Sequence, residues 1–514
     1  MSNDVSGIRQ HGPSASPPLA WVWHRDLDRI PGTGGRTWFL AVVVAATIAL
    51  YYVVYEGGAV SPLLLAQYHM PFTFYVYMVV IGNAAGAFAS LIGGLGDRIG
   101  RANLVVWGLL VTGVLQLVVV PHMPTKVTFA VVTIAIYFVE GIVLVATPAL
   151  IRDFSPQLGR GKAMGFWTLG PVAGSLLVSG VTGGALPVFG TWQSQYVISG
   201  AVCLGVWLIA LFGLRELSPE LRSQLMVSQR DRALIEARVR GIDVRAATAS
   251  PWRQMLRWNI VGSAFAISVF LLIYYAAVGF FTLYFTTIFG LSTAQANGIN
   301  AAFWAVNCVI LVVVGIVSDL VRVRKPFMVL GAALAIASLI AFLTRATHPD
   351  TSYGTLILLT SLIAAGLGIA YAPWMASFTE TVEARNPALM ATGLAVWGWI
   401  LRIVIAVSTA LIPVVVTTVS ILVEAPAVLA KVPKSGPVPP ALSARVAEIK
   451  AAAAASPHQW QIWWWVCVGG LVVFVPFIFG MTGYWRTRSA RRAADEHETR
   501  VQAELARYTA DEQA

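Results

Sequence analysis

Three charged side chains lie inside otherwise apolar stretches of the sequence: Glu56, Glu140 and Arg402. A charged group at membrane depth is costly, so such residues usually mark a binding site or an ion pathway. A buried carboxylate holds a proton more readily than one in water and can release it when its access to water changes. Glu56 and Glu140 are therefore candidate proton-coupling residues. A guanidinium keeps its charge, so Arg402 needs a carboxylate partner or an anionic ligand.

Each of these residues also has a second interpretation. At about 1.5 Å per residue counted from Trp38, Glu56 lies well above the middle of its apolar segment, so it is alternatively a carboxylate at the outer membrane interface. Glu140 lies about 18 Å from the segment end marked by Arg152, near mid-depth. Arg402 either binds a substrate carboxylate or forms a structural ion pair with one of the glutamates.

Polar and aromatic residues on the same segments are candidates for lining a substrate pocket. Two adjacent tyrosine pairs stand out, Tyr51-Tyr52 and Tyr274-Tyr275. An amide between small residues, as at Asn83, also suggests hydrogen bonding between helices. For any single aromatic residue, packing or an interfacial position is the more common role. The substrate-binding candidates are Arg402, Tyr52, Asn83, Tyr275, Asn307 and Trp374.

The elements that must position these residues are membrane-spanning helices. Of 514 residues, 57% are hydrophobic and 11% are charged, whereas ordinary soluble proteins have about 25% charged residues. Twelve apolar segments of about 18 to 25 residues can be marked, each long enough to span a bilayer. The sequence therefore predicts an all-α membrane protein. Its predicted parts are an N-terminal tail (1–36), a six-helix bundle (37–214), a linker (215–257), a second six-helix bundle (258–485) and a C-terminal tail (486–514).

Charge outside the apolar segments predicts the orientation of the chain. Lys and Arg are concentrated in the two tails, the linker and the loops on the same side, so both termini and the linker are predicted to be cytoplasmic. This distribution accounts for the net charge of +11 without nucleic acid. Arg far outnumbers Lys and Ala is abundant, which favours a GC-rich bacterial genome and hence the bacterial cytoplasmic membrane. A long external loop, 424–459, has an Ala-rich end that could form a helix.

No cofactor or metal is expected from the sequence. The three cysteines, Cys203, Cys308 and Cys467, all lie inside apolar stretches, far from metal-ligand spacing or loop pairing. No nucleophile-base set or nucleotide-binding loop stands out either. The sequence therefore argues against a membrane-embedded enzyme.

An internal repeat of about 220 residues relates the two bundles. The run from Gly93 to Arg101 reads Gly-Gly-Leu-Gly-Asp-Arg-Ile-Gly-Arg, and a weaker copy begins at Gly315; Asp97 and Asp319 lie 222 positions apart. The spacing of 225 positions between Pro148 and Pro373 agrees with it. In these features the chain resembles the major facilitator superfamily of secondary transporters over nearly its whole ordered length.

This resemblance implies a fold and a set of gating residues. The fold has twelve transmembrane helices in two six-helix, pseudo-symmetric halves, and the protein is expected to work as a monomer in the lipid bilayer. Physically, Gly100 permits a tight turn, and a carboxylate among basic residues at a helix end can form a charge-assisted contact. The alternative is a plain turn that follows the positive-inside rule. The gating residues that the resemblance implies are Gly93, Asp97, Arg98, Gly100, Arg101, Asp319 and Arg324.

The leading functional hypothesis is proton-coupled transport of a small polar metabolite by symport. An organic acid is favoured as the substrate because of Arg402. The alternative is a multidrug/proton antiporter, because Gly170-Pro171 begins a fragment that partly resembles the Gly-Pro motif of proton-linked antiporters. Glu140 stands where exporters often carry a basic residue, which weakens that alternative. A transporter-derived sensor also remains open, and measured flux would separate it from a transporter.

Overall fold

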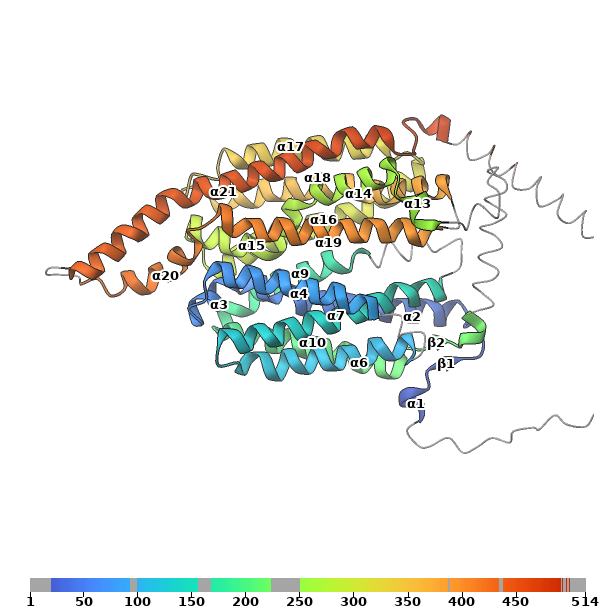
Figure 1. Ribbon diagram of the computed structural model, residues 1–514, viewed down its shortest axis with the longest axis horizontal. Helices are drawn as coiled ribbons and strands as arrows, with labels where there is room; N and C mark the ends of the chain where they lie inside the picture. Colours follow the sequence, from blue (N-terminus) through green and yellow to red (C-terminus); the bar gives the residue numbers. More distant parts are fainter. Residues whose placement is uncertain are drawn as a thin grey trace, which may run out of the picture.

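The computed structural model describes residues 20–92, 99–155, 168–222, 250–386, 389–433 and 438–490, with three further residues at 492, 496 and 499. The described chain is almost entirely helical and forms two bundles that lie side by side (Figure 1). Among the described residues, 12 helical segments are long and apolar enough to cross a membrane. The protein is therefore a multi-pass membrane protein with an all-α fold.

The N-terminal bundle contains the first six of these segments. A π-helical turn and a 3₁₀ turn prolong its third segment, and a short helix follows the first. Its elements are α2 (Thr33–Ala59), α3 (Ser61–Gln67), α4 (Phe72–Ile92), α6 (Arg101–Val114), η2 (Leu115–Val119), η3 (Val120–His122), α7 (Lys126–Phe154), α9 (Gly170–Phe189) and α10 (Trp192–Gly213).

The C-terminal bundle repeats this arrangement. Its first segment is interrupted at Leu271, between α14 and α15. Its elements are α13 (Pro251–Met255), α14 (Trp258–Phe270), α15 (Leu272–Phe289), α16 (Thr293–Val321), α17 (Lys325–Leu343), α18 (Tyr353–Arg385), α19 (Met390–Val415), α20 (Val419–Leu429) and α21 (Pro440–Gly480).

The repeat seen in the sequence has a structural counterpart in α7 and α18. Each helix carries a proline inside it, Pro148 in α7 and Pro373 in α18. Helix α7 packs closely on α4 because glycines face each other: a Cβ added to Gly141 would meet the backbone of Gly86. Contacts of this kind are how helices associate in a bilayer, where apolar burial alone gives little driving force.

Helices α20 and α21 project from one end of the molecule (Figure 1). Helix α21 has 41 residues, about 60 Å, which is roughly twice the thickness of the hydrocarbon core. The guanidinium of Arg445 on α21 bonds the carboxylate of Glu424 on α20. The segment 424–459, expected as an external loop, is thus largely helical. We call this end of the molecule the arm end.

The opposite end, from which the linker leaves after residue 222, is called the linker end. A two-residue strand, β1 (Asp26–Leu27), pairs in parallel with β2 (Glu216–Leu217) there. Arg25 is buried and donates to Asn103 Oδ1 and to the carbonyl of Leu211. Burial lowers the pKa of Arg25 to about 10, helped by Arg215 and opposed by Glu216. The segment before α2 is therefore fixed to the start of the linker.

Candidate functional site

Glu140 and Arg402 face each other from opposite halves of the molecule. Glu140 lies in α7, about 21 Å from its linker end, and Arg402 lies in α19, about 18 Å from the same end. The two groups are close enough to interact electrostatically, but they form no direct ion pair. Glu140 is 9% exposed and Arg402 is exposed. A carboxylate and a guanidinium at similar depth, without a direct bond between them, can hold a proton and an anion.

Tyrosines from three helices surround this pair. Tyr51 on α2 lies within electrostatic reach of Glu140, Arg402 and Tyr371. Tyr274 on α15 lies within similar reach of Tyr51 and Tyr371. All three tyrosines are half-buried. The site between the halves is therefore aromatic and hydroxyl-rich around a single pair of opposite charges.

Asn307 and Trp374 support these tyrosines from behind. The hydroxyl of Tyr274 donates to Asn307 Oδ1 at 3.3 Å, while Asn307 Nδ2 donates to the carbonyl of Ala364 at 2.9 Å. Trp374 is fully buried and stacks on Tyr371 with ring centroids 6.0 Å apart. In this conformation Asn307 contacts Tyr274 and Trp374 contacts Tyr371, so both residues position tyrosines of the site.

The three other sequence candidates have different surroundings. Tyr52 is 1% exposed and packs with Val178 on α9. Tyr275 is half-buried and lies within electrostatic reach of Tyr371, and its hydroxyl has no hydrogen-bond partner among the described residues. Asn83 is exposed, and its amide donates to the carbonyl of Val79 on its own helix at 2.9 Å. The predicted bond from Asn83 to another helix is therefore wrong, because this face of α4 is not covered by a neighbour.

Glu56 occupies a different environment near the arm end. It is three residues before the end of α2, at the depth expected from the sequence, and it is completely buried by the surrounding helices. Its Oε1 accepts a hydrogen bond of 3.0 Å from Thr182 on α9, whereas Oε2 is buried without a partner in the described structure. An unpartnered carboxylate oxygen in a dry site favours the protonated form or a bound water.

The gating residues of the first half form a network at the linker end. Gly100, with φ of +98°, begins α6 and adopts a conformation that glycine tolerates best. Arg101 Nη1 contacts Asp153 Oδ2 at the end of α7 at 2.7 Å. Glu216 accepts hydrogen bonds from the backbone N–H groups of Arg101 and Ala102. Burial raises the pKa of the Glu216 carboxyl, and those two bonds act against the rise.

The second half has a matching network. Arg324 Nη1 contacts Asp319 Oδ1 at 2.6 Å, and its Nε contacts Glu380 Oε1 on α18 at 3.2 Å. Helices α7 and α18 thus each supply a carboxylate for an arginine at the start of the previous transmembrane segment. The remaining gating candidates, Gly93, Asp97 and Arg98, lie outside the described residues.

At the arm end the two halves are in direct contact. Asn297 Nδ2 on α16 donates to the carbonyl of Ala59 on α2 at 2.8 Å, and the amide of Phe72 on α4 donates to Ser420 Oγ at 2.8 Å. A Cβ added to Gly58 would meet the carbonyl of Val278. Glu56 therefore lies two residues from a contact that closes this end.

The described residues contain no group of three or more His, Cys, Asp or Glu side chains placed to bind a metal. Sequence reasoning missed Tyr371, since nothing in its neighbourhood distinguishes it from a packing tyrosine. It also missed Tyr137 and Tyr196, which lie inside the N-terminal bundle.

Comparisons with known proteins agree with this architecture. The sequence model of the Major Facilitator Superfamily matches residues 37–409. Solved structures with a similar fold include a bacterial homologue of the human lysosomal transporter Spinster, inward-facing and unoccupied, with 15% identity, a TM-score of 0.58, and coverage of 87% of this chain and 99% of that chain. A D-xylose-proton symporter has 14% identity and a TM-score of 0.59, with the same coverage of 87% and 99%. The xylose transporter XylE from E. coli, in a partially occluded inward open conformation, has 14% identity and a TM-score of 0.55 over 82% of this chain and 97% of that chain. No curated protein matches the chain in sequence.

Proposed function

The chain belongs to the major facilitator superfamily, and we propose from this premise that it carries a small organic acid together with a proton. Membership of this family makes it a transporter and not an enzyme. The observation that supports this proposal is the pair formed by Glu140 and Arg402 across the two halves. A D-xylose-proton symporter among the similarly folded structures makes proton coupling a reasonable starting point.

Coupling follows from the charges of this pair. A single guanidinium at low dielectric cannot stabilise two carboxylates well, so the substrate anion and ionised Glu140 compete for Arg402. A proton on Glu140 removes that competition and lets the substrate carboxylate bind Arg402. When Glu140 loses the proton, it regains Arg402 and displaces the substrate. Proton and substrate therefore bind with positive cooperativity.

The other site residues take supporting roles in this proposal. Tyr51, Tyr274 and Tyr371 offer hydroxyl and ring contacts to the substrate, while Asn307 and Trp374 hold two of them in place. Tyr52, which is buried here, would contact the substrate only in another conformation, while Asn83 and Tyr275 remain candidate substrate contacts. The gating residues around Arg101 and Arg324 hold the linker end in its alternative states.

The proposed topology places the linker and both termini in the cytoplasm of a bacterial cell. The parts are the tail 1–36, the halves 37–214 and 258–485, the linker 215–257 and the tail 486–514. The present conformation would then be closed on the outside, where Asn297 contacts Ala59, and would load or release substrate on the inside. The protein would act as a monomer, since each half supplies one member of the charged pair.

A multidrug/proton antiporter is the second candidate, favoured by the aromatic lining of the site. At the start of α9, a Cβ added to Gly170 would meet the side chain of Thr47, and one added to Gly174 would meet Tyr51. The Gly-Pro fragment therefore brings α9 close to α2, which is a structural role in either mechanism. In an exporter the substrates would be lipophilic cations, which Glu140 and the rings could bind without help from Arg402.

Proton flux in proteoliposomes tests the proposal. The full chain is reconstituted with a pH-sensitive dye inside, and pools of organic acids, sugars, amino acids and lipophilic cations are added outside. Proton entry driven by an organic acid and lost in Arg402→Met supports symport of an anion. Proton movement opposite to a lipophilic cation, unaffected by Arg402→Met, establishes the antiporter instead.

A further inference from the structure

A small cavity lies among the helices of the N-terminal half, apart from the Glu140–Arg402 pair. Its volume is about 30 Å³, and roughly 10–15 Å³ is enough for one water molecule. The lining comes from α2, α4, η2, α7 and α10. The residues are Val53, Val54, Gly57, Gly58, Tyr75, Met78, Val79, Gln116, Thr133, Ile136, Tyr137 and Tyr196.

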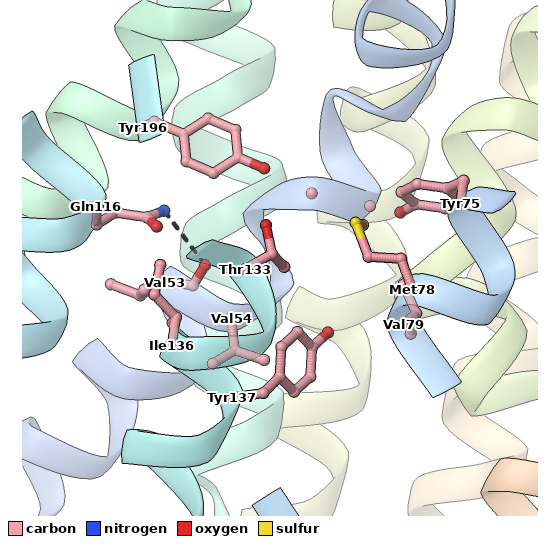
Figure 2. A pocket seen from close by; sticks show the side chains of 12 residues that line it. Val53, Val54, Tyr75, Met78, Val79, Gln116, Thr133, Ile136, Tyr137 and Tyr196 are labelled. Atoms are coloured by element: carbon pink, nitrogen blue, oxygen red, sulfur yellow. Dashed lines mark hydrogen bonds between the residues drawn. The ribbon is translucent and has the colours of Figure 1, made fainter. Parts of the chain in front are cut away.

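Hydroxyl groups approach this cavity from three sides. Figure 2 shows the hydroxyls of Tyr75, Tyr137 and Tyr196 reaching toward the same space from α4, α7 and α10. Gln116 instead donates to the carbonyl of Val53 at 3.3 Å and to Ser199 Oγ at 3.0 Å. The side chains of Tyr137 and Tyr196 line the cavity and are only 8% and 4% exposed. Buried hydroxyls normally have a hydrogen-bond partner, and water is a partner that fits a cavity of this size.

Gly57, the residue that follows Glu56 on α2, lines the cavity. A Cβ added to Gly57 would lie 3.4 Å from the hydroxyl oxygen of Tyr196 and 3.9 Å from that of Tyr75. The missing side chain at this position thus keeps the space between the two hydroxyls open. Tyr196 is also within electrostatic reach of Glu56, whose Oε2 lacks a partner in the described structure.

Another lining residue, Tyr137, lies within electrostatic reach of Glu140. Tyr137 precedes Glu140 by three residues on α7, so the two side chains lie on the same face of that helix. Their depths below the arm end of α7 are about 16 and 21 Å, whereas Glu56 lies about 5 Å below the arm end of α2. The tyrosines thus span the depth that separates the two carboxylates.

We propose that this cavity holds water and, with Tyr137 and Tyr196, forms a relay that passes protons between Glu140 and Glu56. The inference rests on the proposed proton coupling. The polar groups facing Glu56 are Tyr52, Thr182 and Tyr196, and those facing Glu140 are Arg402, Tyr51, Tyr55 and Tyr137. Of the groups named here only Arg402, which faces Glu140, is cationic.

Transfer through the relay is balanced in atoms and charge. The carboxyl O–H bond of Glu140 breaks as a new O–H bond forms on the oxygen of Tyr137, which gives its own proton to the cavity water. The water passes a proton to Tyr196, whose original proton forms the O–H bond on Glu56. Hydroxyls and water can donate and accept at once, so no electron transfer or further reactant is needed. One proton leaves Glu140 and one arrives at Glu56.

The test follows the protonation of Glu56 without any substrate. The full chain in lipid vesicles is subjected to a rapid drop in pH at the linker side, and the infrared C=O band of protonated Glu56 is followed in time. Glu56→Gln identifies that band by its loss. Tyr137→Phe and Tyr196→Phe keep the rings, and each removes one transfer step. Each variant should therefore lower the rate at which the Glu56 band appears by about tenfold or more. Gly57→Ala, which fills the space, should slow it as well.

Tyr68→Phe is the matched control, because Tyr68 is in the same half but its hydroxyl donates to the carbonyl of Met123. Its rate should equal that of the unaltered protein. Unchanged rates in Tyr137→Phe and Tyr196→Phe, or a Glu56 band absent at every pH, would overturn the relay. Because no substrate is used, this test is independent of the flux measurement. Slower appearance of the Glu56 band in the tyrosine variants would support the relay even if the unaltered protein showed no substrate-driven proton flux, a result that would refute the proposed symport.

Discussion

Glu56 and Glu140 are the same residue type in the same half, yet their surroundings differ. Glu140 is 9% exposed and faces the guanidinium of Arg402 from the other half. Glu56 is completely buried, and among the described residues only Thr182 on α9 binds its carboxylate. Glu140 and an anionic ligand can therefore compete for the guanidinium of Arg402. Glu56 has no such partner, so its charge can change only when a proton reaches it through the protein.

The difference indicates a division of roles. The proposed substrate site contains Arg402, the charged group of the second half that lies near Glu140 among the described residues. The site around Glu56 lies beside the contact between Asn297 and Ala59 that closes the arm end. A charge on Glu56 would be stabilised poorly there, so its protonation state should bias closure of that end. In the proposed mechanism Glu140 would couple substrate binding to proton binding, and Glu56 would couple proton binding to conformation.

The largest effect is expected from Glu140→Gln. A neutral amide cannot release a proton or compete with the substrate for Arg402, so substrate-driven proton entry should fall by about 100-fold or more. Exchange of labelled for unlabelled substrate should continue, since it needs no net proton movement. Proteoliposome flux measures both. The control is Glu448→Gln, which removes an exposed carboxylate at the arm end. If substrate-driven proton entry persists in Glu140→Gln, Glu140 is not the proton-coupling residue.

Arg402→Met is expected to act on affinity. A charge-assisted bond to a substrate carboxylate contributes about 1.5–3 kcal/mol, so substrate binding should weaken by about 10- to 100-fold. Calorimetric titration of the detergent-solubilised protein measures this change. Arg402→Lys should recover part of the affinity, because it keeps the charge but not the planar fork.

A purely structural ion pair would behave differently. Arg402→Met would then lower the thermal stability without changing affinity, and Glu140→Gln in the same chain would restore the stability. The double-mutant cycle therefore decides between a substrate ligand and a structural partner.

Much of the fold was predictable because a bilayer permits little else. Long apolar segments must be helices, and the recurrence of the loop pattern at Asp97 and Asp319 required two related halves. The family match and the similar solved structures confirm this all-α fold. The helical nature of 424–459 was harder to foresee, because packing of α20 against α21, with Arg445 bonded to Glu424, is a contact between segments distant in sequence.

The site was predictable in its charges but not in its aromatic residues. A charge in an apolar segment is visible in the sequence, so Glu56, Glu140 and Arg402 could be named. Adjacent tyrosines differ by about 100° around a helix, so the sequence could not tell which one faces the site. The structure directs Tyr51 toward Glu140 and buries Tyr52 against α9.

Glu56→Gln should have a smaller effect than Glu140→Gln and a different kind of effect. The neutral amide resembles the protonated carboxyl, so the arm end should stay closed for longer. The net transport rate should fall by about tenfold while substrate affinity stays within about twofold, because Glu56 does not contact the Arg402 site. Rates and affinities from the same preparation test this. An affinity loss as large as that of Arg402→Met would contradict the division of roles.

Thr182→Val tests the same division with the smallest expected change. The substitution keeps the shape of the side chain and removes one hydrogen bond to Glu56, worth about 1 kcal/mol, or roughly fivefold in a rate or equilibrium. Ser179→Ala is the control, because the Ser179 hydroxyl lies one turn earlier on α9 and bonds the carbonyl of Ser175 on its own helix. If Glu56 controls closure, Thr182→Val should change the net transport rate about fivefold and Ser179→Ala should not. Equal effects of the two variants would mean that Thr182 contributes only to helix packing, and Glu56 would then lose its proposed control over the arm end.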